Sequence, residues 1–238
     1  MKFLNSTLII CTASLASFGL QAEETTSPWN AEAELGFIKT SGNSDTESLN
    51  MKAKAVNETS IRTYTGKLET ARTKNSSTVT GERYFASGKG EYNLDESAFL
   101  FVLLTYEDDR FSGYDYQATE TVGYGRHLIK QDDLSLKAEL GAGAKQADLT
   151  TGTSESGSIV RVGADLKWKI SKSATFTEEL SIESSSDNTI TKSVTGLKTR
   201  IDESLSSKIT YTWKNNSDVA PTIKDTDTEL AVTLVYSF

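Results

Sequence analysis

The sequence predicts an all-β fold, an antiparallel transmembrane β-barrel of about twelve strands with both termini on the periplasmic side. Three observations predict it. Apolar and polar residues alternate with a period of two in segment after segment. The connections between these segments alternate between tight and long. After residue 22, no apolar run approaches the roughly 20 residues that a membrane-spanning helix needs.

The N-terminus has the pattern of a signal peptide. Lys2 is followed by an apolar stretch over residues 8–20, and Ala22 precedes the acidic pair Glu23 and Glu24. A short apolar stretch before a small residue is typical of a cleaved export signal. We therefore expect residues 1–22 to be removed and residues 23–238 to form one outer-membrane β-barrel domain.

The cysteine content and the net charge exclude some classes of function. Cys11 is the sole cysteine and lies in the export signal, so the mature chain has no thiol or disulfide chemistry. A lipid anchor on Cys11 is disfavoured because bulky Ile10 precedes it. The chain has 33 acidic and 25 basic residues, a formal charge of −8. That balance argues against nucleic acid as a partner.

The C-terminal segment shows the alternation most clearly. One face of residues 228–238 is entirely apolar, and it ends in two aromatic side chains: Leu230, Val232, Leu234, Tyr236 and Phe238. This row resembles the assembly signal that the barrel-assembly machinery recognises in the last strand of such proteins. We expect that machinery to be a partner, together with outer-membrane lipid and lipopolysaccharide, and the barrel to be a monomer.

The other segments follow the same rule. Their predicted bounds are 29–40, 46–56, 61–73, 79–92, 97–106, 114–126, 134–146, 158–170, 174–184, 189–200, 204–213 and 228–238. Tight connections near 57–60, 93–96, 171–173 and 201–203 are typical of periplasmic turns. Longer polar connections near 41–45, 107–113, 147–157 and 214–227 are typical of external loops.

Aromatic residues near segment ends favour a barrel in lipid over a soluble lipocalin-like barrel or sandwich, because interfacial girdles surround membrane barrels. Two features fit less well. Glu120 and Glu178 fall in apolar rows, so they lie near the rims or the register is wrong there. The segment from Phe99 to Leu104 is apolar on both faces, which predicts that Leu100, Val102 and Leu104 point into a partly packed interior.

Several motifs resemble a known family. They are Trp29-x-Ala31-x-Ala33-x-x-Gly36, Thr40-Ser41-Gly42-Asn43-Ser44-Asp45-Thr46, Arg83-Tyr84, Lys89, Glu91-Tyr92, Tyr106-Glu107-Asp108-Asp109-Arg110-Phe111, Gly113-Tyr114-Asp115, Gly123 and Gly125. Together they resemble the salt-stress-induced outer-membrane protein family, whose function is unknown. The resemblance implies a Gram-negative outer-membrane location and a link to salt or envelope stress. It supplies no catalytic residues.

The residue inventory disfavours an enzyme. His127 is the only histidine, and we expect it at a rim beside a periplasmic turn, where it suits neither a Ser-His lipid hydrolase nor a protease. One histidine and no mature cysteine exclude a metal site built on those ligands, and no cofactor is expected. The acidic group Glu107, Asp108, Asp109 and Asp115 is interpreted as a solvated hairpin, with Arg110 counting against calcium.

The polar rows predict a charged interior. Two neighbouring segments carry seven candidate lumen charges: Lys137, Glu139, Lys145, Arg161, Asp165, Lys167 and Lys169. Such charges either line a narrow wet pore or pair across the lumen and close it. The sequence therefore favours a non-enzymatic barrel linked to salt or envelope stress, a narrow channel or a structural envelope component. A lipid-active enzyme and a soluble periplasmic ligand-binding barrel are the alternatives.

Overall fold

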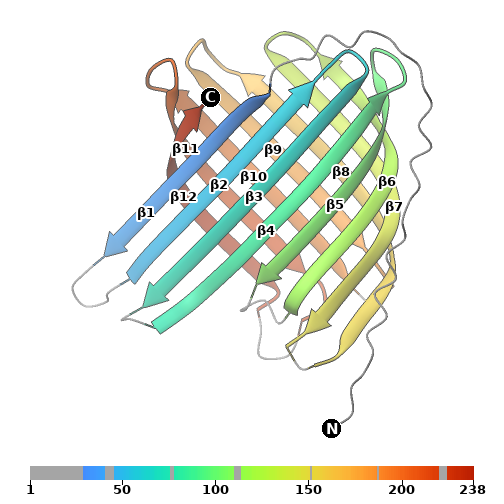
Figure 1. The fold of residues 1–238 in the computed structure, drawn as a ribbon, viewed down its shortest axis with the longest axis vertical. Helices are drawn as coiled ribbons and strands as arrows, with labels where there is room; N and C mark the ends of the chain where they lie inside the picture. The colour runs from blue at the N-terminus through green and yellow to red at the C-terminus, as the bar shows by residue number, and fades with distance from the viewer. Residues whose placement is uncertain are drawn as a thin grey trace.

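The computed structural model describes residues 29–40, 46–75, 78–109, 114–150, 152–186, 188–219 and 224–238. These residues form a closed antiparallel barrel in which each strand pairs with its neighbours in the sequence and β12 pairs with β1 (Figure 1). Among them, no helix is long and apolar enough to cross a membrane. The predicted export signal lies outside the described residues.

The strands follow the predicted segments closely. Their bounds are β1 Asn30–Thr40, β2 Thr46–Glu58, β3 Arg62–Asn75, β4 Thr78–Asn93, β5 Ala98–Asp109, β6 Tyr114–Lys130, β7 Leu134–Leu149, β8 Ser154–Lys169, β9 Ala174–Ser184, β10 Thr189–Arg200, β11 Leu205–Asn216 and β12 Thr226–Ser237. The prediction of a twelve-stranded all-β barrel is confirmed. Most differences extend a strand into its polar flank, because polar residues can continue a ladder beyond the apolar band.

One end of the barrel, the upper end in Figure 1, carries five tight turns at 59–61, 94–97, 131–133, 170–173 and 201–204. We call it the turn end and the opposite end the loop end. In two of these turns an aspartate accepts both backbone N–H groups that follow the bend: Asp95 those of Ser97 and Ala98, and Asp202 those of Ser204 and Leu205. These bonds hold the pKa of both carboxyl groups below its usual value.

The outward rows are apolar and exposed. In β12 the predicted assembly row faces outward throughout, with Leu230 64% and Phe238 76% exposed. On the other face of the same strand Ala231, Thr233 and Val235 are buried, Val235 fully so. An exposed apolar face of this extent would be unstable in water, whereas lipid covers it at no cost.

The inward face of β5 corrects the sequence prediction. Phe99, Phe101 and Leu103 are the buried residues, and Leu100 and Val102 are each 49% exposed on the outside. Leu104, which was also expected to point inward, is exposed there too. A segment that is apolar on both faces does not reveal which face is inside. The expectation of a partly packed interior holds, but with the opposite set of side chains.

Glycines on the next strands make room for the two phenylalanines. Phe99 pairs with Gly125 of β6, and Phe101 pairs with Gly123 of the same strand. A Cβ atom built on Gly125 would overlap the Phe99 ring. A Cβ atom on Gly141 of β7 would lie 3.1 Å from Phe101 Cζ. Each ring therefore covers the bare backbone of its neighbours, a pairing that lets large side chains fit inside a curved sheet.

Both misfit glutamates lie on the outward rows, so the predicted register is right there. Glu120 pairs with Leu104 and is exposed. Glu178 lies near the middle of β9, not at a rim, and its carboxylate accepts hydrogen bonds from the hydroxyls of Ser193 and Thr195, both at 2.6 Å. These two donors partly offset the cost of placing a carboxylate on an outward face.

The barrel closes over a short seam. The register between β1 and β12 runs over only four residue pairs, from Glu32 with Ser237 to Leu35 with Leu234. At the turn end, the backbone N–H of Phe238 donates to the carbonyl of Ala31 at 2.9 Å. The last residue of the chain therefore takes part directly in closure.

Candidate functional site: the charged lumen

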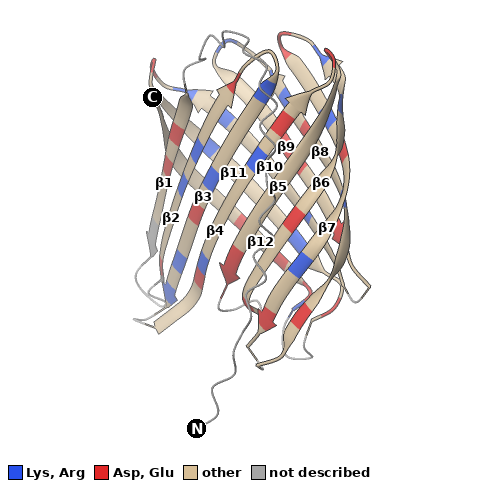
Figure 2. Ribbon diagram, turned by 45° about the vertical axis from the view of Figure 1, so that its right-hand side comes forward, with Lys and Arg blue, Asp and Glu red and all other residues tan. Residues whose placement is uncertain are grey.

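Ion pairs cross the interior of the barrel. Lys67 on β3 lies 2.6 Å from Glu179 on β9, and Lys214 on β11 lies 3.0 Å from Glu107 on β5. In both cases the two strands lie half way round the ring from each other. Side chains from opposite walls therefore meet inside the lumen at two places. Figure 2 shows acidic and basic positions interspersed along the strands that supply these pairs.

A second network joins β4 to β7 on the side where Phe99, Phe101 and Leu103 are buried, which we call the packed side. Lys137 Nζ lies 3.0 Å from Glu91 Oε1, Lys89 also lies 3.0 Å from Glu91, and Lys89 pairs with Glu139. The ammonium of Lys137 stands 5.5 Å from the centre of the Phe99 ring. Burial strengthens these charge interactions and makes each partner costly to remove. Two of the seven predicted lumen charges, Lys137 and Glu139, belong to this network.

Two further predicted lumen charges have acidic partners on adjacent strands. Arg161 donates to Glu183 of β9 at 2.6 Å, and Lys145 lies 3.5 Å from Glu155. The sequence interpretation counted five bases against two acids on β7 and β8. The structure adds acids from neighbouring strands, so most of the expected positive excess on this wall is neutralised.

The remaining predicted charges lie on β8 toward the turn end. Asp165 is directly opposite Lys137 in the β7–β8 register. Lys167 and Lys169 follow on the same inward row and are exposed. The lumen therefore has basic side chains in contact with water at its turn end.

The sequence interpretation missed several charges that build the interior. They are Glu107, Lys192, Lys214, Glu179 and Glu229. Glu107 was assigned to a loop cluster, whereas it continues the inward row of β5. A parity count carried to the real end of each strand would have found Glu107 and Lys214, since strict alternation extends through the polar ends. Glu179, Lys192 and Glu229 lie inside the predicted segments, where the same alternation already puts them on the inward row.

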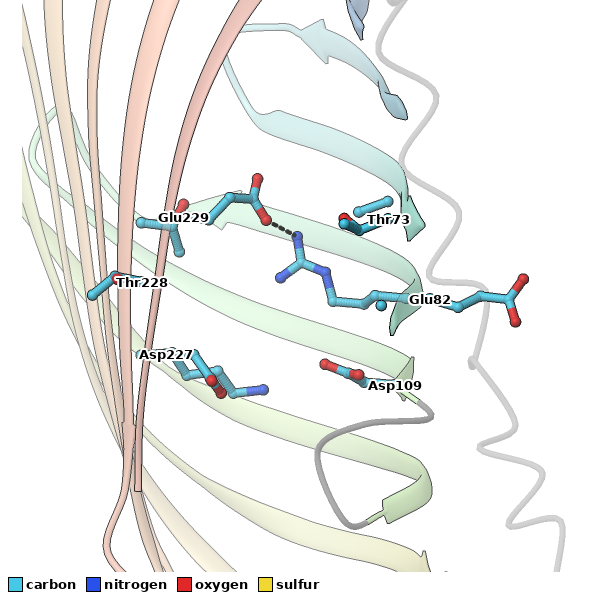
Figure 3. Close-up of a pocket in the computed structure, with 11 residues that line it drawn as sticks. Thr73, Glu82, Asp109, Asp227, Thr228 and Glu229 are labelled. Atoms are coloured by element: carbon cyan, nitrogen blue, oxygen red, sulfur yellow. Dashed lines mark ion pairs between the residues drawn. The ribbon is translucent and has the colours of Figure 1, made fainter. Parts of the chain in front are cut away.

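The loop end of the lumen contains a cavity of about 220 Å³. We call it the loop-end cavity, and its lining residues are Ala71, Thr73, Gly81, Glu82, Arg83, Asp109, Thr212, Lys214, Asp227, Thr228 and Glu229. Arg83 lies 3.5 Å from Glu229 and 3.8 Å from Glu69. In Figure 3, Asp227 and Glu229 lie on one side and Asp109 on the other, and Glu82 points away.

The acidic group that the sequence analysis interprets as a solvated hairpin is divided by the barrel wall. Glu107 pairs with Lys214 inside, and Asp109 lines the loop-end cavity. Asp108 pairs with Tyr84 in the outward register of β4 and β5. Within the described part of the chain, no group of three or more His, Cys, Asp or Glu side chains is arranged to hold a metal ion.

His127 lies on β6 with its ring tilted against Phe99, 5.5 Å between centroids. Its Nδ1 atom is buried without a hydrogen-bond partner. The ring is part of the packing around Phe99, on the inward row. That position is away from the lipid-facing surface where a lipid hydrolase would need its base.

A comparison with protein families matches residues 33–238 to the family described as "Protein of unknown function, DUF481". The chain belongs to this family. A relative in Escherichia coli (strain K12), "Uncharacterized protein YdiY", is 26% identical over 215 residues, covering 88% of this chain and 83% of the relative. Family membership therefore assigns no activity.

Solved structures with a similar shape are outer-membrane barrels. The NanC porin has a TM-score of 0.55 at 11% identity, with 89% of this chain and 99% of the porin covered. The translocator domain of the autotransporter NalP from Neisseria meningitidis has a TM-score of 0.50 at 13% identity, covering 92% and 91%. At these identities the similarity shows the fold, an outer-membrane type of β-barrel.

Proposed function

We propose that the protein is a non-enzymatic barrel of the outer membrane whose lumen is a narrow, low-conductance pore for small charged solutes. The observation that best supports this proposal is that two ion pairs, Lys67–Glu179 and Lys214–Glu107, cross the charged lumen from one wall to the other. Charged side chains in a barrel of intermediate size need either partners or water. The cross-lumen pairs form the constriction, and water reaches the charges on either side of it.

Features at both ends of the lumen support a water-filled path through the barrel. The loop end is hollow, with a cavity of about 220 Å³. The turn end has the exposed bases Lys167 and Lys169. The outward apolar rows support an outer-membrane location, since closed barrels are the strand-built structures that cross lipid. In the orientation we propose, tight turns and both termini face the periplasm.

The link to salt or envelope stress is part of the proposal. Its support is that the constriction is built from ion pairs. Their attraction weakens as the Debye length falls from roughly 10 Å at 0.1 M salt to 3 Å at 1 M. Side chains of Lys67 and Glu179, 28% and 44% exposed, lie close enough to water to respond.

Planar-bilayer recording of the reconstituted barrel tests this function. We expect small current steps whose conductance rises more steeply with salt than bulk conductivity does, because screening loosens the cross-lumen pairs. A barrel that is folded by its heat-modifiable gel migration and carries no current at any voltage or salt concentration would overturn the pore.

A structural envelope component is the second candidate, and one observation favours it. Phe99, Phe101 and Leu103 fill part of the interior on the β4–β7 side. If this packing and the ion pairs leave no continuous path, deleting the protein should weaken the envelope although the barrel conducts nothing. A lipid-active enzyme gains no support from the position of His127 against Phe99.

A further inference from the structure

The loop-end cavity has charges of both signs on its walls. Arg83 and Lys214 bring positive charge from β4 and β11, and Asp109, Asp227 and Glu229 bring negative charge from β5 and β12. Threonine side chains complete much of the remaining lining. A ligand in this cavity therefore meets cationic donors and carboxylate acceptors together.

Arg83 has donors to offer. Its guanidinium is 3.5 Å from one Glu229 oxygen and 3.8 Å from one Glu69 oxygen, longer than the roughly 2.7–2.9 Å of a charge-assisted hydrogen bond. The side chain is only 16% exposed. A guanidinium has five N–H donors in a planar fork that matches a carboxylate. Arg83 is thus held in place by charge while its fork remains open to a ligand.

The carboxylates on the cavity wall determine which ligands with a carboxylate group can bind. A simple anion that approached Arg83 would also approach Asp227 and Glu229, which repel it. A simple cation attracted to those carboxylates would be repelled by Arg83 and Lys214. A solute with both charges avoids both penalties, and rejection by like charge is a common basis of specificity.

We propose that the loop-end cavity is a binding subsite for a small zwitterion, a solute with a carboxylate and an ammonium a few atoms apart, such as an α-amino acid. The ligand carboxylate accepts from Arg83, and its ammonium donates to Asp227. The cavity volume of about 220 Å³ is below the roughly 300–1,000 Å³ of pockets for drug-sized ligands, which suits a molecule of a few heavy atoms. The subsite rests on the proposed function in that solutes enter it from the lumen.

Titration calorimetry on the detergent-folded barrel tests the subsite without recording current. The three probes are L-alanine, lactate, which lacks the ammonium, and L-alaninamide, which lacks the carboxylate. We expect measurable binding of L-alanine alone. Arg83→Gln should weaken it about tenfold or more, the scale of one lost charge-assisted hydrogen bond. Asp227→Asn, at an exposed position, should also weaken it.

Arg72→Gln is the matched control, because Arg72 is near the loop end but its row faces outward, where it pairs with Glu82. It should bind L-alanine as the wild type does. Equal binding of lactate and L-alanine, no binding of L-alanine, or wild-type affinity in a folded Arg83→Gln barrel would each overturn the subsite. Binding by a barrel that never conducts would overturn the pore and leave the subsite standing.

Discussion

The barrel has its hydrophobic core cluster between β4 and β7 and its shortest strand pairing where β12 meets β1. On the packed side, β6 and β7 pair at fifteen positions, with register shifts near both ends of the ladder, and Phe99 and Phe101 lie on glycines of these strands. At the seam the register covers four pairs. The difference teaches that stability and closure reside in different places. Buried aromatic side chains and their ion pairs hold the packed side, whereas a few backbone bonds, outward aromatics and the ion pairs of Glu32 and Glu34 with Lys198 and Lys208 complete the ring.

The largest expected effect is on the packed side. Gly125→Val should prevent stable folding, since its Cβ would overlap the ring of Phe99, which is fully buried and has no room to move. Gly88→Val is the control, because a Cβ at Gly88 meets nothing within 4 Å and the position is exposed. Heat-modifiable gel migration after refolding measures both variants. Equal refolding yields would show that the Phe99–Gly125 contact does not limit packing.

The next effect is at the seam. Deleting Phe238 removes the backbone donor to Ala31 and the edge-on contact of its ring with Tyr236, 4.9 Å between centroids. We expect most of the protein to remain periplasmic and protease-sensitive, because the assembly row loses its terminal aromatic. Phe37→Ala, an exposed aromatic on the other seam strand, should assemble normally. Cell fractionation with immunoblotting decides, and normal outer-membrane levels after the deletion would refute the assembly signal.

A smaller effect is expected in the lumen. Glu179→Gln leaves the ammonium of Lys67 without its partner across the lumen, so the pore should become more selective for anions and stay folded. The stability change should be modest because both side chains are partly exposed. Glu120→Gln is the control, since Glu120 faces outward. Reversal potentials in a salt gradient measure the shift, and identical potentials for Glu179→Gln and wild type would place Lys67 outside the conducting path.

The smallest effect is at the turns. The backbone donors of Ser97 and Ala98 lower the pKa of Asp95, and those of Leu205 and Ser204 lower that of Asp202. The stability these bonds contribute is therefore present above the unfolded value near pH 4 and is lost as the pH falls through the lower folded value. Asp95→Asn and Asp202→Asn together should flatten the acid limb of a urea-unfolding series. An unchanged acid limb would count against this role.

Much of the fold could be predicted because apolar and polar residues alternate along nearly every strand of a barrel in lipid. The bounds of β9 and β10 agree with the predicted segments at both ends, since alternation stops there at polar turns. Strand β5 shows where alternation fails to identify the inward face. Its two apolar faces left the inward one undetermined, and the glycines at 123, 125 and 141 that settle the question lie on other strands.

The charged site was predicted as a row but not as a set of partners. Lys137 and Arg161 could be placed on inward rows by counting, yet their partners Glu91 and Glu183 depend on which strands face each other and at what height. That depends on strand tilt and stagger, which residue spacing within one segment does not encode. The loop-end cavity was missed for the same reason, because it joins five strands that only closure brings together.

The ion pairs of the lumen also bear on the order in which the barrel is built. Lys198 reaches Glu32 and Lys208 reaches Glu34, partners 166 and 174 residues apart in the chain. Neither bond can form while strands are being added one hairpin at a time, because one partner belongs to the first strand and the other to the tenth or eleventh. Hairpins can form early from local contacts, whereas these two ion pairs can form only when the barrel closes. They stabilise the finished product, so an incomplete or misordered ring would keep wetted, unmatched charges on its inner surface.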